Sequence, residues 1–167
     1  MTKKNRFFIF MVAAVIWILC LCSCGESTDG VTLNGKPLKM PCKINDLNGD
    51  FEYAPEIYFN VIYNTTKVML TYNGEEFGLA EVNITDKNKL SDADISSIVT
   101  TSQSGLGNMK VDGAGFGSTR SEVLSAIKGT PEKTDGVLKF YEDGYKVIIF
   151  FDESDKVNMI SADCENQ

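Results

Sequence analysis

Short apolar–polar alternations separated by turn residues are the sequence feature that most restricts the fold. The pattern occurs in VTLNGKPLKM from Val31, in KVMLTYNGEEFGLAEV from Lys67 and in VLKFYEDGYKVIIFF from Val137. Asn-Gly pairs accept the positive φ angles of a tight hairpin turn, and a period of two is typical of a strand with one buried face. These segments predict antiparallel hairpins, and ADISSIVTTS from Ala93 predicts one more strand.

The segment GSTRSEVLSAIKGTP, which begins at Gly117, gives the clearest helix signal. Thr119 and Glu122 have the spacing of a capping box, in which each side chain satisfies a backbone donor of the other residue. Gly129 would suit a left-handed cap at the end of the helix. One face of this helix would be apolar and would consist of Val123, Leu124 and Ile127.

Three expected strands follow this helix, VLKFY, YKVIIFF and KVNMISA, in the order of a meander. We therefore expect an α+β fold, with a short helix packed on an antiparallel meander sheet. The first half has a possible helical turn in PCKINDLNG and then strands, so two helix-plus-three-strand pseudo-repeats are a further possibility. A glycine-rich segment divides a mostly-β half, residues 31–104, from a helix-plus-meander half, residues 105–167.

The chain begins with a basic stretch, continues with an apolar run from Phe7 to Ser23, and then becomes polar in GESTDG. This is the layout of a secretory signal. The run is short for a membrane-spanning helix, which usually needs about 20 apolar residues. We expect residues 1–23 to be a signal peptide and residues 24–30 to be a flexible tether, the alternative being an uncleaved N-terminal anchor.

The end of the apolar run, LCSC from Leu21, resembles the lipobox of bacterial lipoprotein signal peptides. The resemblance implies that Cys24 takes a diacylglyceryl group, becomes the first residue after the cut behind Ser23, and is acylated, for example with palmitate. Cys22 fits less well because bulky Leu21 would stand at the cut. The implied location is extracytoplasmic and lipid-anchored to the cell membrane, or to the outer membrane of a host that has one.

Two cysteines, Cys42 and Cys164, are left after the signal is removed and Cys24 is modified. An exported protein meets an oxidising compartment, so we expect these two to form a disulfide. The alternative is that they stay separate thiols.

The charge of the chain limits its partners. The first 23 residues hold three basic groups and no acid, which leaves 13 basic and 23 acidic residues and a formal net charge of −10. Nucleic acid binding depends on Lys and Arg displacing counterions from phosphates. We therefore expect no nucleic acid partner.

The residue types argue against an enzyme. The sequence contains no histidine, which excludes Ser-His-Asp and Cys-His catalysis and the usual zinc sites. The glycine-rich loop GAGFGST lacks the lysine of a phosphate-binding loop. Two acidic groups, at Asp152, Glu153 and Asp155 and at Asp92 and Asp94, do not fit the calcium-binding loop pattern and are expected to be solvated turns. We expect no catalytic residue, metal or cofactor.

An aromatic-rich stretch, FEYAPEIYFNVIY, is the candidate binding surface. Tyrosine offers a large contact area with one polar end, which suits interfaces. The alternative is that these rings pack in the core. The candidate residues are Phe51, Tyr53, Tyr58, Phe59 and Tyr63.

The second half also resembles small outer-membrane lipoproteins of the SmpA, OmlA and BamE type and the beta-lactamase inhibitory proteins. The matching residues are Gly117, Thr119, Glu122, Val123, Gly129, Pro131, Phe151, Asp152 and Val157. The first half is closer to lipoproteins of gut Firmicutes. These resemblances imply a non-enzymatic module that binds a protein, in assembly or as an inhibitor. The alternatives are an extracytoplasmic hydrolase that uses carboxylates and a structural envelope lipoprotein.

Overall fold

A computed structural model describes residues 29–47, 49–60, 65–83, 87–101 and 109–164. The strands in these ranges are β1 (Val31–Leu33), β2 (Lys36–Pro37), β3 (Phe51–Asn60), β4 (Thr65–Tyr72), β5 (Glu75–Asn83), β6 (Asp94–Thr101), β7 (Met109–Val111), β8 (Glu132–Thr134), β9 (Val137–Glu142), β10 (Tyr145–Phe151) and β11 (Val157–Cys164). The helical segments are the α-helix α2 (Arg120–Ala126) and the 3-10 turns η1 (Ile44–Asp46) and η2 (Lys87–Asp92).

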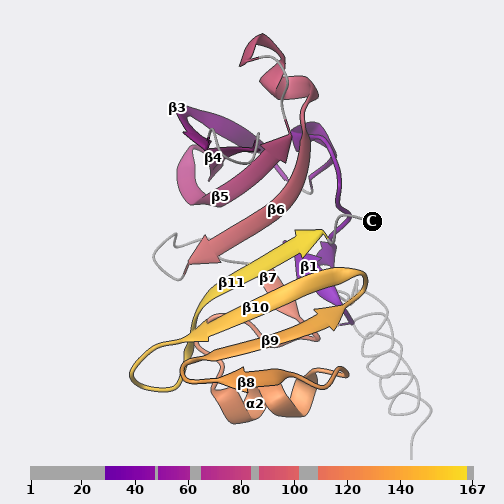
Figure 1. Ribbon diagram of the computed structural model, residues 1–167, viewed down its shortest axis with the longest axis vertical. Helices are drawn as coiled ribbons and strands as arrows, with labels where there is room; N and C mark the ends of the chain where they lie inside the picture. Colours follow the sequence, from indigo (N-terminus) through magenta and orange to yellow (C-terminus); the bar gives the residue numbers. More distant parts are fainter. Residues whose placement is uncertain (1–28, 48, 61–64, 84–86, 102–108, 165–167) are drawn as a thin grey trace, which may run out of the picture.

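The strands form two antiparallel sheets. The larger has eight strands in the order β3-β4-β5-β6-β11-β10-β9-β8, and the smaller has three in the order β2-β1-β7. Figure 1 shows the large sheet running from β3 at the top to β8 at the bottom, with β1 and β7 behind it. Buried residues of both sheets belong to one hydrophobic core, so the small sheet closes the inner face of the large one.

The pairing of β6 with β11 joins the two halves of the chain. These strands pair from Met159 opposite Thr101 to Asp163 opposite Ser97. The C-terminal strand thus lies between β6 of the first half and β10 of the second. Each half supplies part of a sheet that neither completes alone.

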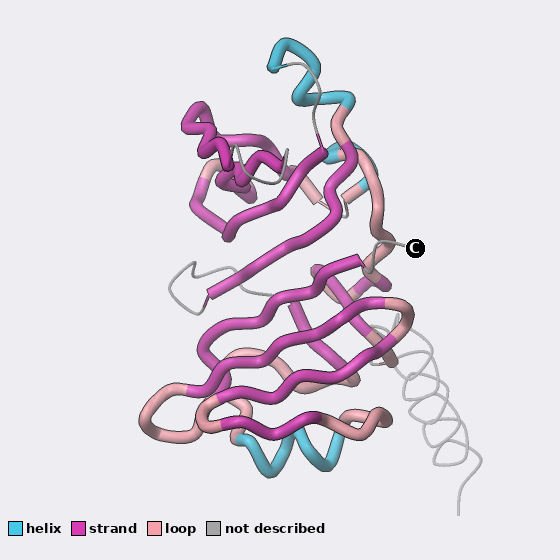
Figure 2. Tube along the Cα trace, in the orientation of Figure 1, coloured by secondary structure: helices cyan, strands magenta, loops and turns pink. Residues whose placement is uncertain are grey.

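The predicted α+β fold is wrong, because the protein is mostly β. Of the described residues, 58% lie in strands, and these residues contain one short α-helix. Figure 2 shows this helix at the β8 end, short helical turns toward the opposite end, and mainly strands between them. A seven-residue helix is too short to be stable by itself, and the β6–β11 pairing joins the strands of both halves into one large sheet.

The expected pair of helix-plus-three-strand units is also wrong. The first half contributes four consecutive strands, β3 to β6, to the large sheet, preceded by the 3-10 turn η1. In the small sheet, β1 and β2 come before these four strands in the sequence, and β7 comes after them. The two halves are therefore built differently.

The predicted hairpins and the meander are confirmed. Asn34 and Gly35 have φ angles of 51° and 72°, and Asn73 and Gly74 have φ angles of 51° and 80°, as a type I′ turn requires. Strands β9, β10 and β11 are consecutive antiparallel neighbours. In each case the local turn chemistry was enough to predict the pairing.

The capping box of α2 is confirmed, but the predicted left-handed cap is wrong. The backbone N–H of Thr119 donates to Glu122 Oε2 over 2.7 Å, and the N–H of Glu122 donates to Thr119 Oγ1 over 3.3 Å. The helix ends at Ile127, which is extended (φ −65°, ψ 141°) and buried. Gly129 serves close packing instead, because a Cβ there would lie 3.2 Å from the backbone oxygen of Tyr141.

The capping box predicts a pH-dependent contribution to stability. Hydrogen bonds from Thr119 lower the pKa of Glu122 below its ordinary 4.5 in the folded protein. A lowered folded pKa gives stability that is present above pH 4.5 and is lost as the pH falls through the folded pKa. We expect Glu122→Gln to destabilise the protein at pH 7 and to have progressively less effect below pH 4.5, as measured by urea unfolding. Glu153→Gln, in an exposed turn, controls for the lost charge, and an effect of Glu122→Gln that is constant down to pH 3 would contradict this account.

Candidate functional site

The outer face of the large sheet carries a continuous set of half-exposed apolar side chains. Along each strand they alternate with core residues, so they point away from the small sheet. The pairings Met69–Leu79, Leu79–Val99, Met159–Phe150 and Phe150–Val137 link them across neighbouring strands. We call this set the apolar band; its members are Met69, Leu79, Val99, Met159, Phe150 and Val137.

Two adjoining hollows lie along the apolar band where it crosses β5, β6 and β11. They have volumes of about 230 and 250 Å³, and both are lined by Leu79 and Val99. The larger hollow also contacts Met69, Phe77 and Met159 and is mainly apolar. The face is therefore hollowed where its apolar side chains meet.

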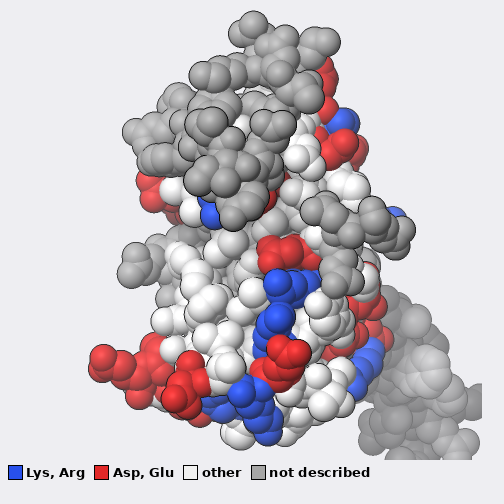
Figure 3. Space-filling view, viewed as in Figure 1, with Lys and Arg blue, Asp and Glu red and all other residues white. Residues whose placement is uncertain are grey.

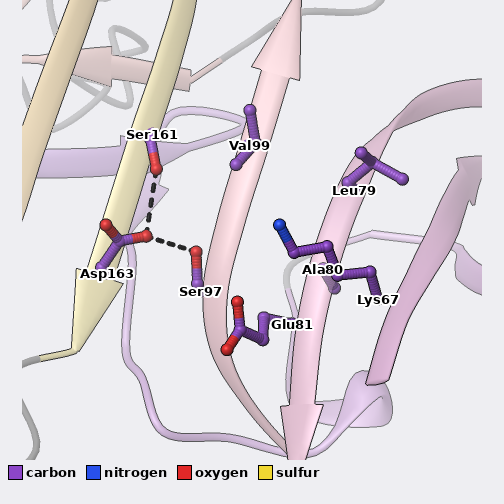
Figure 4. Close-up of a pocket in the computed structure, with 8 residues that line it drawn as sticks. All are labelled: Lys67, Leu79, Ala80, Glu81, Ser97, Val99, Ser161 and Asp163. Carbon is purple, nitrogen blue, oxygen red and sulfur yellow. Dashed lines mark hydrogen bonds between the residues drawn. The ribbon is translucent and has the colours of Figure 1, made fainter. Parts of the chain in front are cut away.

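The smaller hollow has a polar side. Figure 4 shows Ser97, Ser161 and Asp163 close together on one side of it and Lys67 and Glu81 on the other. Ser161 Oγ donates to Asp163 Oδ1 over 3.0 Å, and Ser97 Oγ donates to the same oxygen. These hydrogen bonds hold the carboxylate of Asp163 at a fixed place on the rim.

Charged side chains continue this rim over β10, β9 and β8. Lys146 stands opposite Asp163, and Lys139 stands opposite Glu132 with 3.5 Å between Nζ and Oε2. Figure 3 shows basic and acidic groups gathered in a band over the lower part of this face, beside a region of uncharged side chains. We call the outer surface with the apolar band and this rim the open face.

Two of the five aromatic residues predicted as a binding surface, Phe51 and Tyr53, have described side chains, and both lie away from the open face. Phe51 is a core residue, 6% exposed, whose ring centroid is 4.9 Å from that of Phe77. Tyr53 is half-buried and packs against the core, and its hydroxyl has no hydrogen-bond partner. Burial, followed by the charges of Cys42 and Asp94, raises the pKa of Tyr53 to about 12.

The other predicted site residues are partly outside the described structure. Tyr58 and Phe59 lie in β3, but their side chains are outside the described residues, and so are Tyr63 and Cys24. Cys42 and Cys164 are described and are both packed against the core. The predicted aromatic surface is therefore described only at Phe51 and Tyr53, which pack in or against the core.

The acidic turns and the glycine loop have structural partners. Asp152 Oδ1 accepts from the backbone N–H groups of Ser154 and Lys156, at 2.8 and 2.9 Å, and so closes the turn before β11. In the glycine loop, the N–H of Gly117 donates to the backbone oxygen of Val157 over 3.0 Å. Across the described ranges, no three metal-ligating side chains form a group.

The open face was missed because its residues are spread over separate strands. A signal was present, since KVMLTY, FGLAEV and SSIVTT carry apolar residues at successive positions and therefore on both faces of a strand. Such a strand is either buried on both faces or has an apolar surface left exposed. Only the structure decides between these two cases.

No protein-family model, curated protein or solved structure matches this chain. The resemblance of LCSC to a lipobox and of the second half to assembly lipoproteins therefore stays a prediction. Among the residues that the structure describes, no helix is long and apolar enough to cross a membrane.

Proposed function

We propose that the protein is a lipid-anchored extracytoplasmic lipoprotein that binds a protein partner on its open face and has no enzymatic activity. The observation that carries this proposal is the apolar band with its charged rim. Protein interfaces typically have an apolar core surrounded by polar and charged groups. A run of half-exposed apolar side chains across six strands provides such a core.

The size of the hollows favours a protein over a small molecule. Sites for small molecules are usually clefts of about 300–1,000 Å³ that enclose most of the ligand. The two hollows, of about 230 and 250 Å³, are smaller and lie side by side on a sheet. They suit side chains that project from a partner surface.

The charge of the mature chain supports the same proposal. A net charge of −10 keeps an anchored domain away from anionic lipid surfaces and from other copies of itself. The basic residues Lys67, Lys139 and Lys146 nevertheless stand on the open face. Each lysine stands opposite an acidic residue, namely Glu81, Glu132 or Asp163, so this rim would favour a partner that presents apolar side chains flanked by groups of both charges.

A carboxylate-dependent hydrolase is the second candidate, and one observation favours it. Glu81 and Asp163 line the same hollow from β5 and β11, which are separated by β6 alone. Two strand spacings amount to about 9–10 Å, which is near the carboxylate separation of inverting glycosidases. Glycan hydrolysis that is lost in both Glu81→Gln and Asp163→Asn would favour this candidate over the binding module.

Site-specific photocrosslinking tests the proposed function. A photoreactive phenylalanine analogue at Val99, in the lipidated full-length protein in its source cells, is expected to give one discrete protein adduct. The same analogue at Ser125, which is exposed on α2, is the matched control and is expected to give none. Adding Leu79→Lys places a charge in the apolar band and is expected to reduce the Val99 adduct at least tenfold.

A circular dichroism spectrum and a thermal unfolding midpoint unchanged by Leu79→Lys would show that the lost adduct reflects binding. Equal adducts at Val99 and Ser125, or none at either position, would contradict the proposed function. The latter result would favour a structural envelope lipoprotein.

A further inference from the structure

Cys42 and Cys164 occupy successive places along one edge of β6. Cys42 pairs with Ile95: its backbone N–H donates to Ile95 over 3.4 Å, and the N–H of Ile95 donates back over 2.8 Å. Strand β11 pairs with the same edge as far as Asp163 opposite Ser97, which brings Cys164 opposite Ser96. The other edge of β6 is taken by β5, with Val82 opposite Ile95.

This register brings the two cysteine backbones close together. Strand β6 has a bulge at Ser96, because Ile95 lies opposite Val82 whereas Ser97 lies opposite Glu81. The bulge breaks the usual alternation of side chains, so the partners of Ile95 and Ser96 can share a face, and neighbouring partners on one edge have Cα atoms about 4–6 Å apart. Disulfides usually join cysteines whose Cα atoms are about 4.4–6.8 Å apart. Figure 1 shows the segment between β2 and β3 passing the end of β11.

Both cysteines also lie on the inner face of the sheet. Cys164 stands opposite Tyr145 and Cys42 opposite Ile95, and both of these partners are buried in the core. Residues that face each other across paired strands point to the same side of the sheet. Both side chains therefore lie on the same face, where the structure has them as free thiols partly buried against the core.

Contacts on both sides hold the Cys42 segment in this position. The hydroxyl of Tyr145 donates to the backbone oxygen of Leu38 over 3.0 Å and accepts from the N–H of Met40 over 2.9 Å. On the other side, Lys43 Nζ lies 2.8 Å from Asp94 Oδ1. The segment is thus fixed to β10 and to the start of β6.

The electrostatics fit a structural pair better than a reactive thiol. Burial, then the charges of Asp46, Cys164 and Asp94, raises the pKa of Cys42 to about 11. Burial and the neighbouring Asp163 also raise the pKa of Cys164. Because thiolates are the reactive form, neither cysteine has the features of a catalytic nucleophile.

We propose that Cys42 and Cys164 form a disulfide that fastens the C-terminal strand β11 to the segment between β2 and β3. The Sγ–Sγ bond replaces two S–H bonds, and the two electrons and two protons pass to the disulfide of a thiol–disulfide oxidase, which becomes a dithiol. That the protein meets an oxidising compartment depends on the proposed function, whereas the proximity of the two cysteines depends on the register of β6. The disulfide would link the two segments that pair with the same edge of β6, at the point where β11 ends.

Thiol labelling and peptide mass analysis of the detergent-extracted full-length protein test this proposal. Without reductant, the peptides with Cys42 and Cys164 are expected to be linked and unlabelled by a maleimide, and after reduction both are expected to be labelled. Reduction is expected to lower the thermal midpoint by on the order of 10 °C, because the closed loop spans most of the domain. Cys42→Ser, Cys164→Ser and the double variant are expected to show the same shift, and reductant is expected to have no further effect on them.

The outcomes separate this proposal from the proposed function. Thiols that are labelled in the extracted protein but become linked on incubation with glutathione disulfide would support the pair and contradict the export. Thiols that stay labelled after this incubation of the folded protein would overturn the disulfide. A mixed disulfide of Cys42 or Cys164 with glutathione as the only product would also overturn it.

Discussion

Replacement of Cys24 by Ala is expected to abolish the incorporation of fatty acid into the protein. In the lipobox interpretation, Cys24 carries the thiol that receives the diacylglyceryl group, and no other side chain at the cut can form that thioether. Each buried CH₂ of an acyl chain contributes about 0.8 kcal/mol to membrane binding, so the acyl chains together provide stable anchoring. Metabolic labelling with a fatty acid, followed by gel analysis, measures the effect.

Cys22→Ala is the matched control, because it removes a neighbouring thiol from the same signal. This variant is expected to keep full labelling. Labelling that survives in Cys24→Ala, or that is lost equally in Cys22→Ala, would contradict the assignment of Cys24.

Replacement of Phe77 by Ala is expected to cost about 3–5 kcal/mol of unfolding free energy. Phe77 is fully buried, and its ring packs edge-to-face on Phe51, with Tyr72 6.4 Å away between centroids. Removing the ring loses this apolar burial and leaves a cavity between β3, β4 and β5. Because a domain is typically stable by about 5–15 kcal/mol, the variant would be close to unfolding.

Urea unfolding at pH 7 measures this loss, with Tyr141→Ala as the control. Tyr141 is 53% exposed, so its replacement is expected to cost less than about 1 kcal/mol. Equal losses for the two variants would contradict the placement of Phe77 in the core.

Local turn and cap chemistry could be predicted from the sequence because each depends on neighbouring residues. Asn73 and Gly74 need only their own backbone freedom to set the β4–β5 hairpin. Likewise, Thr119 and Glu122 cap α2 through contacts three residues apart. These features were found where the structure has them.

The long-range pairing could not be predicted, and the fold class was wrong for that reason. The sequence does not say that β11 will pair with β6, because this pairing joins residues about 60 positions apart by register and side-chain packing. The capping box at Thr119 correctly predicts α2, but a helix of seven residues is too small a part of the protein to determine its fold class. The sheet order depends on contacts that no single segment contains.

The same limit applies to the open face and to the cysteine pair. Leu79 and Val99 become neighbours only once β5 pairs with β6, and the pattern of either strand alone does not tell which face stays exposed. The number of cysteines and the expected compartment predict that Cys42 and Cys164 pair. Their common edge on β6 is a property of the fold.

The mass of the amino-terminal peptide of the native protein tests the central claim most directly, because anchoring and export both depend on it. The account predicts a first residue Cys24 that carries a diacylglyceryl group, with Met1 to Ser23 absent. A native chain that begins at Met1, or one whose Cys24 carries a free thiol, would contradict it.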